Sequence, residues 1–181
     1  AYFGPRRGVE DARADAGLID ADGLVYLQLA NTLASSLYDP PLVTIAEDHS
    51  GMPGLCAPPH DGGVGFTYRQ AMGIPPMWRS ILKGAPCSPL PIGRLASALC
   101  DARPEERRLC YVECHDQALV GEQALLFLMI GDAMYTHMDK ASSADGSAKG
   151  ARVRRGIALH KMSRLLTCAL GGNAYLNFIG N

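Results

Sequence analysis

The sequence predicts an α/β fold in which helices connect the strands of a parallel sheet. Two apolar runs, at 42–46 and 109–114, each end in polar residues, and helical patterns over 24–38 and 156–170 alternate with them. About four strands are expected in 181 residues, whereas a complete eight-stranded barrel needs roughly 250. We therefore expect half of a (β/α)8 TIM barrel, with a closed four-stranded doubly wound sheet as the alternative.

The composition is that of an ordinary globular protein, 48% hydrophobic and 19% charged with a formal charge of −1. We expect no nucleic-acid partner because a basic stripe is missing, and no membrane partner because no apolar run approaches roughly 20 residues. Six cysteines without a C-x-x-C motif favour a reducing compartment. Cys110, Cys114 and His115 are poor metal candidates, since a strand would hold the two thiols more than about 10 Å apart. We expect no metal.

Residues 1–23 are expected to form an irregular lead-in that ends in a helix cap at Asp20 to Asp22. The next helix, 24–38, carries an apolar stripe that should face the sheet. The stripe is formed by Tyr26, Ala30, Leu33 and Leu37. Asp39-Pro40-Pro41 ends this helix, and the β-branched run that follows predicts a buried parallel strand.

The middle of the chain predicts short elements. Residues 64–66 resemble a very short strand, and Tyr68 to Met72 could begin a helix that Pro75-Pro76 interrupts before it resumes at 77–82. Trp78 is expected to be a packing residue rather than a platform for a sugar ring. A proline-rich linker at 84–93 leads into a helix at 94–100.

The last third is expected to contain a buried helix at 123–129, a flexible loop at 139–151, a long helix at 156–170 and a final strand at 174–179. The long helix should bury one side. That side is formed by Ile157, His160 or Lys161, Leu165 and Ala169. We interpret His160 as a packing or capping residue.

Candidate functional residues follow the two strands. Glu47 comes directly after the run at 42–46, and His115-Asp116-Gln117 follows the run at 109–114. The carboxyl ends of parallel strands face a ligand crevice, and a charge there is costly unless it has a partner or a function. The alternative is that Glu47 and Asp48 only cap the next turn. If both strand ends lie on one edge of the sheet, their side chains should converge in one ligand crevice.

Five blocks of sequence occur in the order seen in one enzyme family. They are Thr44 to Asp48 with Ser50 to Pro53, Gly62 to Phe66 with Tyr68-Arg69, His115 to Gly121, Gly156 to Met162, and Leu170 to Gly172 with Tyr175 to Phe178. From Leu24 to Asn181 the chain resembles the eukaryotic-type 1,4-α-glucan (glycogen or starch) branching enzymes of the α-amylase-like glycoside hydrolase superfamily. The resemblance implies that 1–181 is a fragment of one catalytic barrel, its C-terminal half, with strands five to eight.

The resemblance also implies roles. Glu47 would end strand five as the general acid/base, and Asp116 would end strand seven as a catalytic residue that stabilises the transition state. His115 and Gln117 would bind substrate. No residue resembles the nucleophilic aspartate of strand four, so we expect the fragment to be inactive alone. Cys114 stands where a serine is more usual.

The implied substrate is an α-glucan polysaccharide, and the implied partner is the missing N-terminal half of the same chain. No metal or organic cofactor is implied. The cytoplasm is the expected location, or the plastid for a starch enzyme. A related α-glucan hydrolase fragment and a non-catalytic α-glucan-binding protein are the alternatives. Open strand edges and apolar faces predict self-association of the isolated piece.

Overall fold

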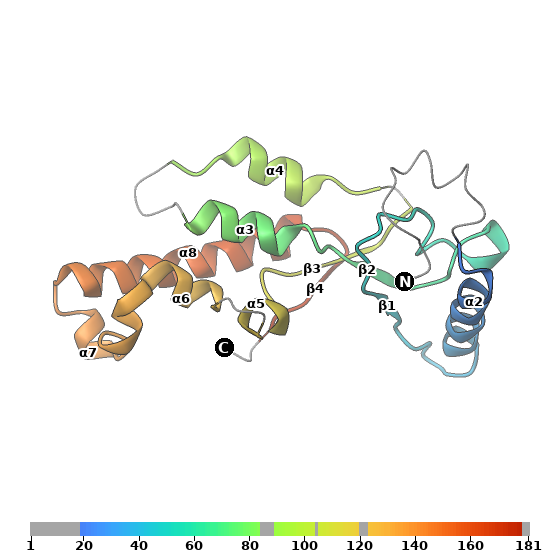
Figure 1. Ribbon diagram of the computed structural model, residues 1–181, viewed down its shortest axis with the longest axis horizontal. Coiled ribbons are helices and arrows are strands. Elements are labelled where there is room, and N and C mark those ends of the chain that lie inside the picture. The colour runs from blue at the N-terminus through green and yellow to red at the C-terminus, as the bar shows by residue number, and fades with distance from the viewer. Residues whose placement is uncertain (1–18, 84–88, 104, 120–122, 179–181) are drawn as a thin grey trace. The chain divides into compact units, whose positions relative to one another are not determined.

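The computed structural model describes residues 19–83, 89–103, 105–119 and 123–178 (Figure 1). The chain forms two compact units. The first unit comprises Ala1–Met72 and Ala102–Leu109, and the second comprises Gly73–Asp101 and Cys110–Asn181.

The first unit contains helix α2 (Ala21–Ser36), strand β1 (Ile45–Ala46), the 3-10 helix η2 (Pro59–Asp61) and strand β2 (Tyr68–Gln70). Strand β3 (Arg108–Cys110) lies at the division between the units. The second unit contains the remaining elements of the described chain. They are α3 (Ile74–Lys83), α4 (Ile92–Cys100), α5 (His115–Leu119), α6 (Leu125–Ile130), η3 (Gly131–Tyr135), α7 (Lys140–Ser143), α8 (Ala148–Leu170) and β4 (Ala174–Tyr175).

The strands form a four-stranded sheet in the order β1-β2-β3-β4. Strands β1 and β2 are parallel with Ile45 opposite Tyr68, and β2 and β3 are parallel with Arg69 opposite Arg108. Beside β4, the Leu176 backbone N–H donates to Cys110 O at 2.9 Å. Helices separate β2 from β3 and β3 from β4 along the chain. The α/β class predicted from the sequence is therefore confirmed.

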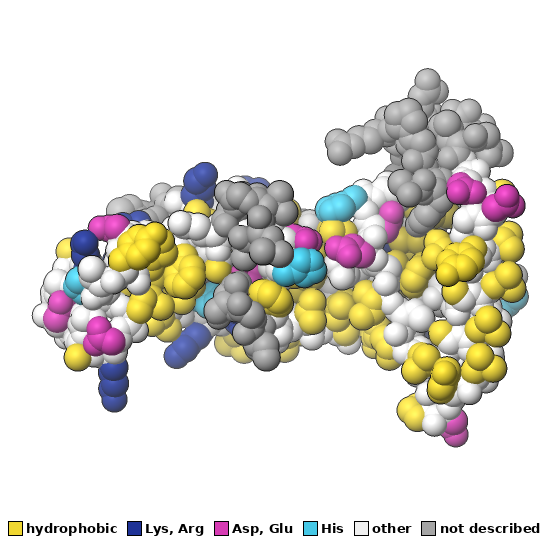
Figure 2. Space-filling view, turned by 60° about the horizontal axis from the view of Figure 1, so that its bottom comes forward, with side chains coloured by type: hydrophobic (Ala, Val, Ile, Leu, Met, Phe, Trp, Pro, Cys, Tyr) yellow, Lys and Arg dark blue, Asp and Glu magenta, His cyan; other side chains and the backbone are white. Residues whose placement is uncertain are grey.

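Helix α2 packs through a different face from the predicted one. Asp20 caps it as predicted, its Oδ1 accepting from Gly23 N at 2.9 Å. Leu24 and Leu27 pack against the small core of Ala46, Leu55 and Val64. The predicted stripe is exposed instead, with Tyr26 71% and Leu37 67% accessible. Hydrophobic side chains accordingly gather on the surface of the part of the molecule that carries α2 (Figure 2).

The strands are shorter than predicted. The run at 42–46 contributes only Ile45 and Ala46 to β1, and only Ala46 is buried, so the predicted strand buried on both faces is wrong. Residues 64–66 form no strand, and Tyr68 begins β2 rather than a helix. Strand β2 forms because it pairs with β1 on one side and β3 on the other, and the local sequence at 68–70 does not indicate these partners.

Helix α3 contains both prolines in its first turn rather than being interrupted by them. The first turn of a helix has N–H groups with no intrahelical acceptor, so proline costs nothing there. Trp78 is fully buried, and its Nε1 donates to Thr167 Oγ1 of α8 at 2.8 Å. This confirms Trp78 as a packing residue.

Helix α8 starts eight residues earlier than the predicted start at 156. Ser147 caps it, and its buried positions include Val153, Gly156, Ser163 and Thr167, whereas Leu165 of the predicted face is 68% exposed. The predicted loop at 139–151 contains α7, capped by Asp139, and the first residues of α8. Side-chain caps thus supply helix starts where the residues are small and polar.

None of the helices in the described ranges has the length and apolar character needed to cross a membrane.

Candidate functional site

Glu47 directly follows strand β1, at the carboxyl end of a parallel strand, as the sequence predicts. Its side chain is exposed. Among the described residues no hydrogen bond involves its carboxylate, whereas Asp48 accepts from Ser50 N at 3.1 Å and from Ser50 Oγ at 2.8 Å. Asp48 therefore caps the turn, and the Glu47 carboxylate stays available to a ligand.

A half-buried ion network holds the segment after Glu47. Arg69 Nη2 lies 3.1 Å from Asp48 Oδ2, and its Nη1 lies 3.0 Å from Glu106 Oε1. The same Nη1 donates to Met52 O at 3.1 Å, and Arg103 Nη1 lies 3.0 Å from Glu106 Oε1. Since Arg69 belongs to β2, the network ties the turn after Glu47 to the neighbouring strand and positions that turn.

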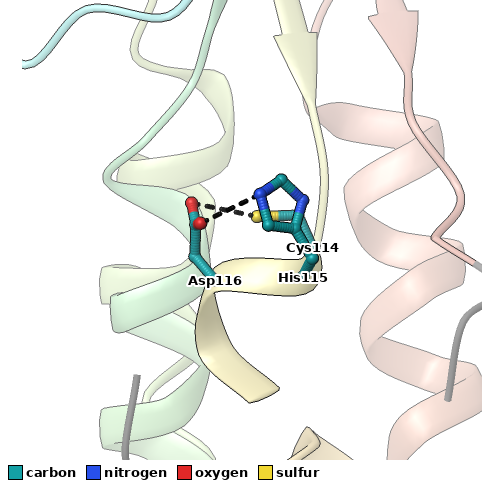
Figure 3. A group of neighbouring side chains, drawn as sticks. All are labelled: Cys114, His115 and Asp116. Carbon is teal, nitrogen blue, oxygen red and sulfur yellow. Dashed lines mark hydrogen bonds and ion pairs between the residues drawn. The ribbon is translucent and has the colours of Figure 1, made fainter. Parts of the chain in front are cut away.

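In the second unit, His115, Asp116 and Gln117 form the first turn of α5 rather than the tip of a strand, because β3 ends at Cys110. His115 Nε2 lies 3.2 Å from Asp116 Oδ1, and the Cys114 thiol lies 3.4 Å from Asp116 Oδ2 (Figure 3). Gln117 Oε1 accepts from Cys114 N at 2.7 Å. The imidazole is 65% and the carboxylate side chain 40% exposed, so both are accessible to a ligand.

A buried charge cluster lies directly before this group. Glu113 is 3% exposed, and its Oε1 lies 2.9 Å from His160 Nε2 and 3.2 Å from Arg164 Nη2. Its Oε2 accepts from Leu125 N at 2.8 Å. Burial raises the pKa of Glu113, but the hydrogen bonds from His160, Leu125 and Arg164 and the charge of His160 outweigh it and lower that pKa. Glu113 is therefore held as a buried carboxylate.

The cluster joins separate segments of the second unit. Arg164 also donates to Asn177 Oδ1 at 2.7 Å and to Phe178 O at 3.3 Å. Together, Glu113, His160 and Arg164 thereby link the segment after β3, helix α8, the start of α6 and the segment after β4. Sequence reasoning treated His160 as a packing or capping residue and gave Glu113 no role. The one available signal was a charged residue inside the apolar run at 109–114.

Three groups of metal-ligand type lie together at the start of α5. Cys114, His115 and Asp116 each offer one atom, and these atoms all lie within 4.8 Å of one another. The sequence suggested a different trio, with Cys110 in place of Asp116. Cys110 is instead fully buried, and its thiol contacts Gly171 O.

The structure thus brings together His115, Asp116 and Gln117 in the second unit, while Glu47 belongs to the first unit. The convergence of the two strand ends stays a prediction. Locally, each group suits acid–base or hydroxyl-binding chemistry. An exposed carboxylate can transfer a proton, and an imidazole–carboxylate pair offers both a donor and acceptors to polar substrate groups.

An α/β fold with parallel strands and accessible acid–base side chains after two of them is the arrangement of many enzymes that act at a sheet's carboxyl edge.

No protein-family model matches the chain. Curated proteins match it closely. A protein of the fungus Rhizophagus irregularis is 47% identical over 163 residues, 90% of this chain, and one of Emericella nidulans is 46% identical over 180 residues, 99% of this chain. A protein of the cat, Felis catus, is 47% identical over 163 residues.

All three relatives are named 1,4-alpha-glucan-branching enzyme. The chain is homologous to one segment of these branching enzymes, and the family resemblance noted from the sequence is confirmed. It spans 22% to 24% of the length of these relatives.

Proposed function

We propose that the chain is the second half of the catalytic barrel of a 1,4-α-glucan branching enzyme. The reaction is retaining cleavage of an α-1,4-glucosidic bond and transfer of the released chain to a glucan 6-hydroxyl, which creates an α-1,6 branch in glycogen or starch. The observation that carries the proposal is the 46% identity over 99% of the chain to a protein of that name.

The strand order supports a half-barrel within this proposal. The four strands follow one another without a reversal, β1-β2-β3-β4. A doubly wound sheet reverses its order at a switch point, whereas a barrel adds its strands in sequence. In this assignment β1 to β4 correspond to barrel strands five to eight.

The local geometry supports a division of roles. A retaining mechanism uses one carboxyl group as nucleophile and a second as acid and then base, about 5–5.5 Å apart. Glu47, exposed after β1, acts as the acid/base. Asp116 binds sugar hydroxyls and stabilises the oxocarbenium-like transition state, and His115 donates a hydrogen bond to the same ring. Gln117 Oε1 is bonded to Cys114 N, which leaves its amide N–H groups for substrate.

The proposed partner is the rest of the polypeptide, which supplies the nucleophilic aspartate. The isolated chain is inactive in this proposal, because no residue of its sequence resembles that aspartate. The proposed location is the cytoplasm, or the plastid if the polymer is starch. A related α-glucan hydrolase uses the same groups, and the names of the relatives favour the transferase.

A chimera tests the proposal. The protein of Saccharomyces cerevisiae named 1,4-alpha-glucan-branching enzyme is 44% identical over 167 residues, and this chain replaces that segment in it. We expect the chimera to lower the iodine absorbance of amylose without a matching release of reducing ends. Glu47→Gln should lower the rate roughly 10²–10⁴-fold, while Glu105→Gln, an exposed carboxylate elsewhere, should not. Release of reducing ends in step with the absorbance loss would indicate a hydrolase instead.

A further inference from the structure

We propose that Cys114, His115 and Asp116 form a binding site for a thiophilic divalent cation such as Zn²⁺. A thiolate sulfur, an imidazole nitrogen and a carboxylate oxygen are the three ligand types that zinc takes from proteins. The side chains come from consecutive residues at the start of α5 and point toward one another (Figure 3).

The spacing fits tetrahedral coordination. Zinc–ligand bonds of about 2.3 Å to sulfur and about 2.0–2.2 Å to nitrogen and oxygen place neighbouring ligand atoms roughly 3.3–3.6 Å apart. The Cys114 thiol lies 3.4 Å from Asp116 Oδ2, and His115 Nε2 lies 3.2 Å from Asp116 Oδ1. All three donor atoms lie within 4.8 Å of one another, a separation that one ion can bridge. Water supplies the fourth position.

The surroundings of the three side chains leave the ion a route from solvent. His115 and Asp116 are accessible, whereas Cys114 is buried, so a cation from solvent meets the exposed pair first. Binding displaces the thiol proton of Cys114 to solvent, and the ion takes the place of the contacts of Asp116 with His115 and Cys114. The hydrogen bond from Cys114 N to Gln117 and the Glu113 cluster stay in place.

The consequence rests on the proposed function. Asp116 and His115 are the groups expected to hold sugar hydroxyls, so an ion bound to them competes with the α-glucan. The cation is therefore an inhibitor of the reaction rather than its cofactor, which agrees with a branching chemistry that requires no metal.

Co²⁺ is the probe, because it occupies zinc sites and a cobalt–thiolate bond gives a charge-transfer absorption band. Titration of the 181-residue chain should produce that band together with tetrahedral d–d bands, and Zn²⁺ should abolish both. Cys114→Ser should remove the thiolate band, and Asp116→Asn should weaken binding at least about tenfold, since changes even beyond the ligands typically cost 10–100-fold. Circular dichroism establishes that each variant is folded.

Cys168→Ser is the matched control, because Cys168 is an exposed thiol of the same unit outside the cluster. It should leave the band and the affinity unchanged. A thiolate band that survives Cys114→Ser, or one lost equally in Cys168→Ser, would show binding at scattered thiols and overturn the site. In the chimera, where the rest of the barrel completes the proposed glucan site, a soluble malto-oligosaccharide should lower the apparent Co²⁺ affinity. Unchanged affinity beside an intact band would refute the competition with glucan and leave the cation site standing.

Discussion

At the scale of single residues, Glu113 stabilises the second unit because its buried carboxylate accepts hydrogen bonds from three donors, on His160, Arg164 and Leu125. Glu113→Gln keeps the shape of the side chain but removes the charge that Arg164 and His160 face. Breaking a buried ion pair from one side typically costs 3–5 kcal/mol, and partial exposure of Arg164 reduces this here to about 3 kcal/mol. Urea unfolding monitored by far-UV circular dichroism measures the loss in the free energy of unfolding.

The difference in the free energy of unfolding between wild type and Glu113→Gln should also depend on pH. The pKa of Glu113 is lower in the folded chain than its ordinary value of 4.5. The stabilisation is therefore complete above about pH 4.5, and it is lost as the pH falls through the folded-state pKa. The difference in the free energy of unfolding between wild type and Glu113→Gln should become smaller below pH 4.5. EDTA is present to keep the cluster at Cys114 free of metal. A gap that stays constant down to acid unfolding would contradict the ion-pair account.

The sequence identified the candidate residues that follow strands but not the charges that support them. Glu47, His115 and Asp116 follow apolar runs, and this local pattern is visible in one sequence. Glu113 and His160 are 47 residues apart, and their pairing depends on which side of α8 faces the segment after β3. The ion pairs of Arg69 with Asp48 and Glu106 could not be predicted for the same reason, because they depend on which segments lie close together in the folded chain.

At the scale of elements, the helices show why their predicted faces failed. Helix α2 has two apolar sides, and only the weaker one, Leu24 with Leu27, packs on the core. Helix α8 buries small residues, Gly156 and Ser163 among them, because it lies close to its neighbours. A search for large apolar residues at helical spacing selects the exposed side in both cases. The existence of α2 and α8 was predictable, whereas the orientation of each helix depends on contacts from elsewhere.

The close approach of α8 to α6 predicts that alanine in place of Gly156 destabilises the fold. A Cβ atom at Gly156 would lie 2.5 Å from Ile130 Cγ2, a methyl group of a fully buried branched side chain. Alanine favours a helix over glycine by up to about 1 kcal/mol, but overpacking costs typically 1–3 kcal/mol. Gly156→Ala should therefore lower the free energy of unfolding by roughly 1 kcal/mol.

Gly93 of α4 provides the matched control, since a Cβ atom there has no neighbour within 4 Å. Gly93→Ala should leave stability unchanged or raise it by up to about 1 kcal/mol. Denaturant midpoints of the two variants in parallel measure the contrast. Equal and favourable shifts in both would show that α6 and α8 separate easily, and that the small residue at 156 is not required for their packing.

At the scale of the whole molecule, the exposed apolar side of α2 sets the behaviour of the chain in solution. Its large side chains are at least half exposed. They are Val25, Tyr26, Leu29, Leu33 and Leu37. Contiguous apolar surface of this kind marks a contact face, and without a cover it drives association. We expect concentration-dependent self-association of the isolated chain by sedimentation velocity.

The double variant Leu29→Glu with Leu33→Lys tests whether this side of α2 causes the association. The two new charges are four residues apart with the acid first, an arrangement that supports the helix while removing two apolar contacts. Since burying one leucine is worth roughly 1.5–3 kcal/mol, the association constant should fall more than about tenfold. Leu165→Lys, at an exposed position on α8, should change the association constant little. If the wild-type chain is monomeric at every concentration, or if Leu165→Lys is as effective as the double variant, then the apolar side of α2 does not govern association and the chain tolerates that surface in water.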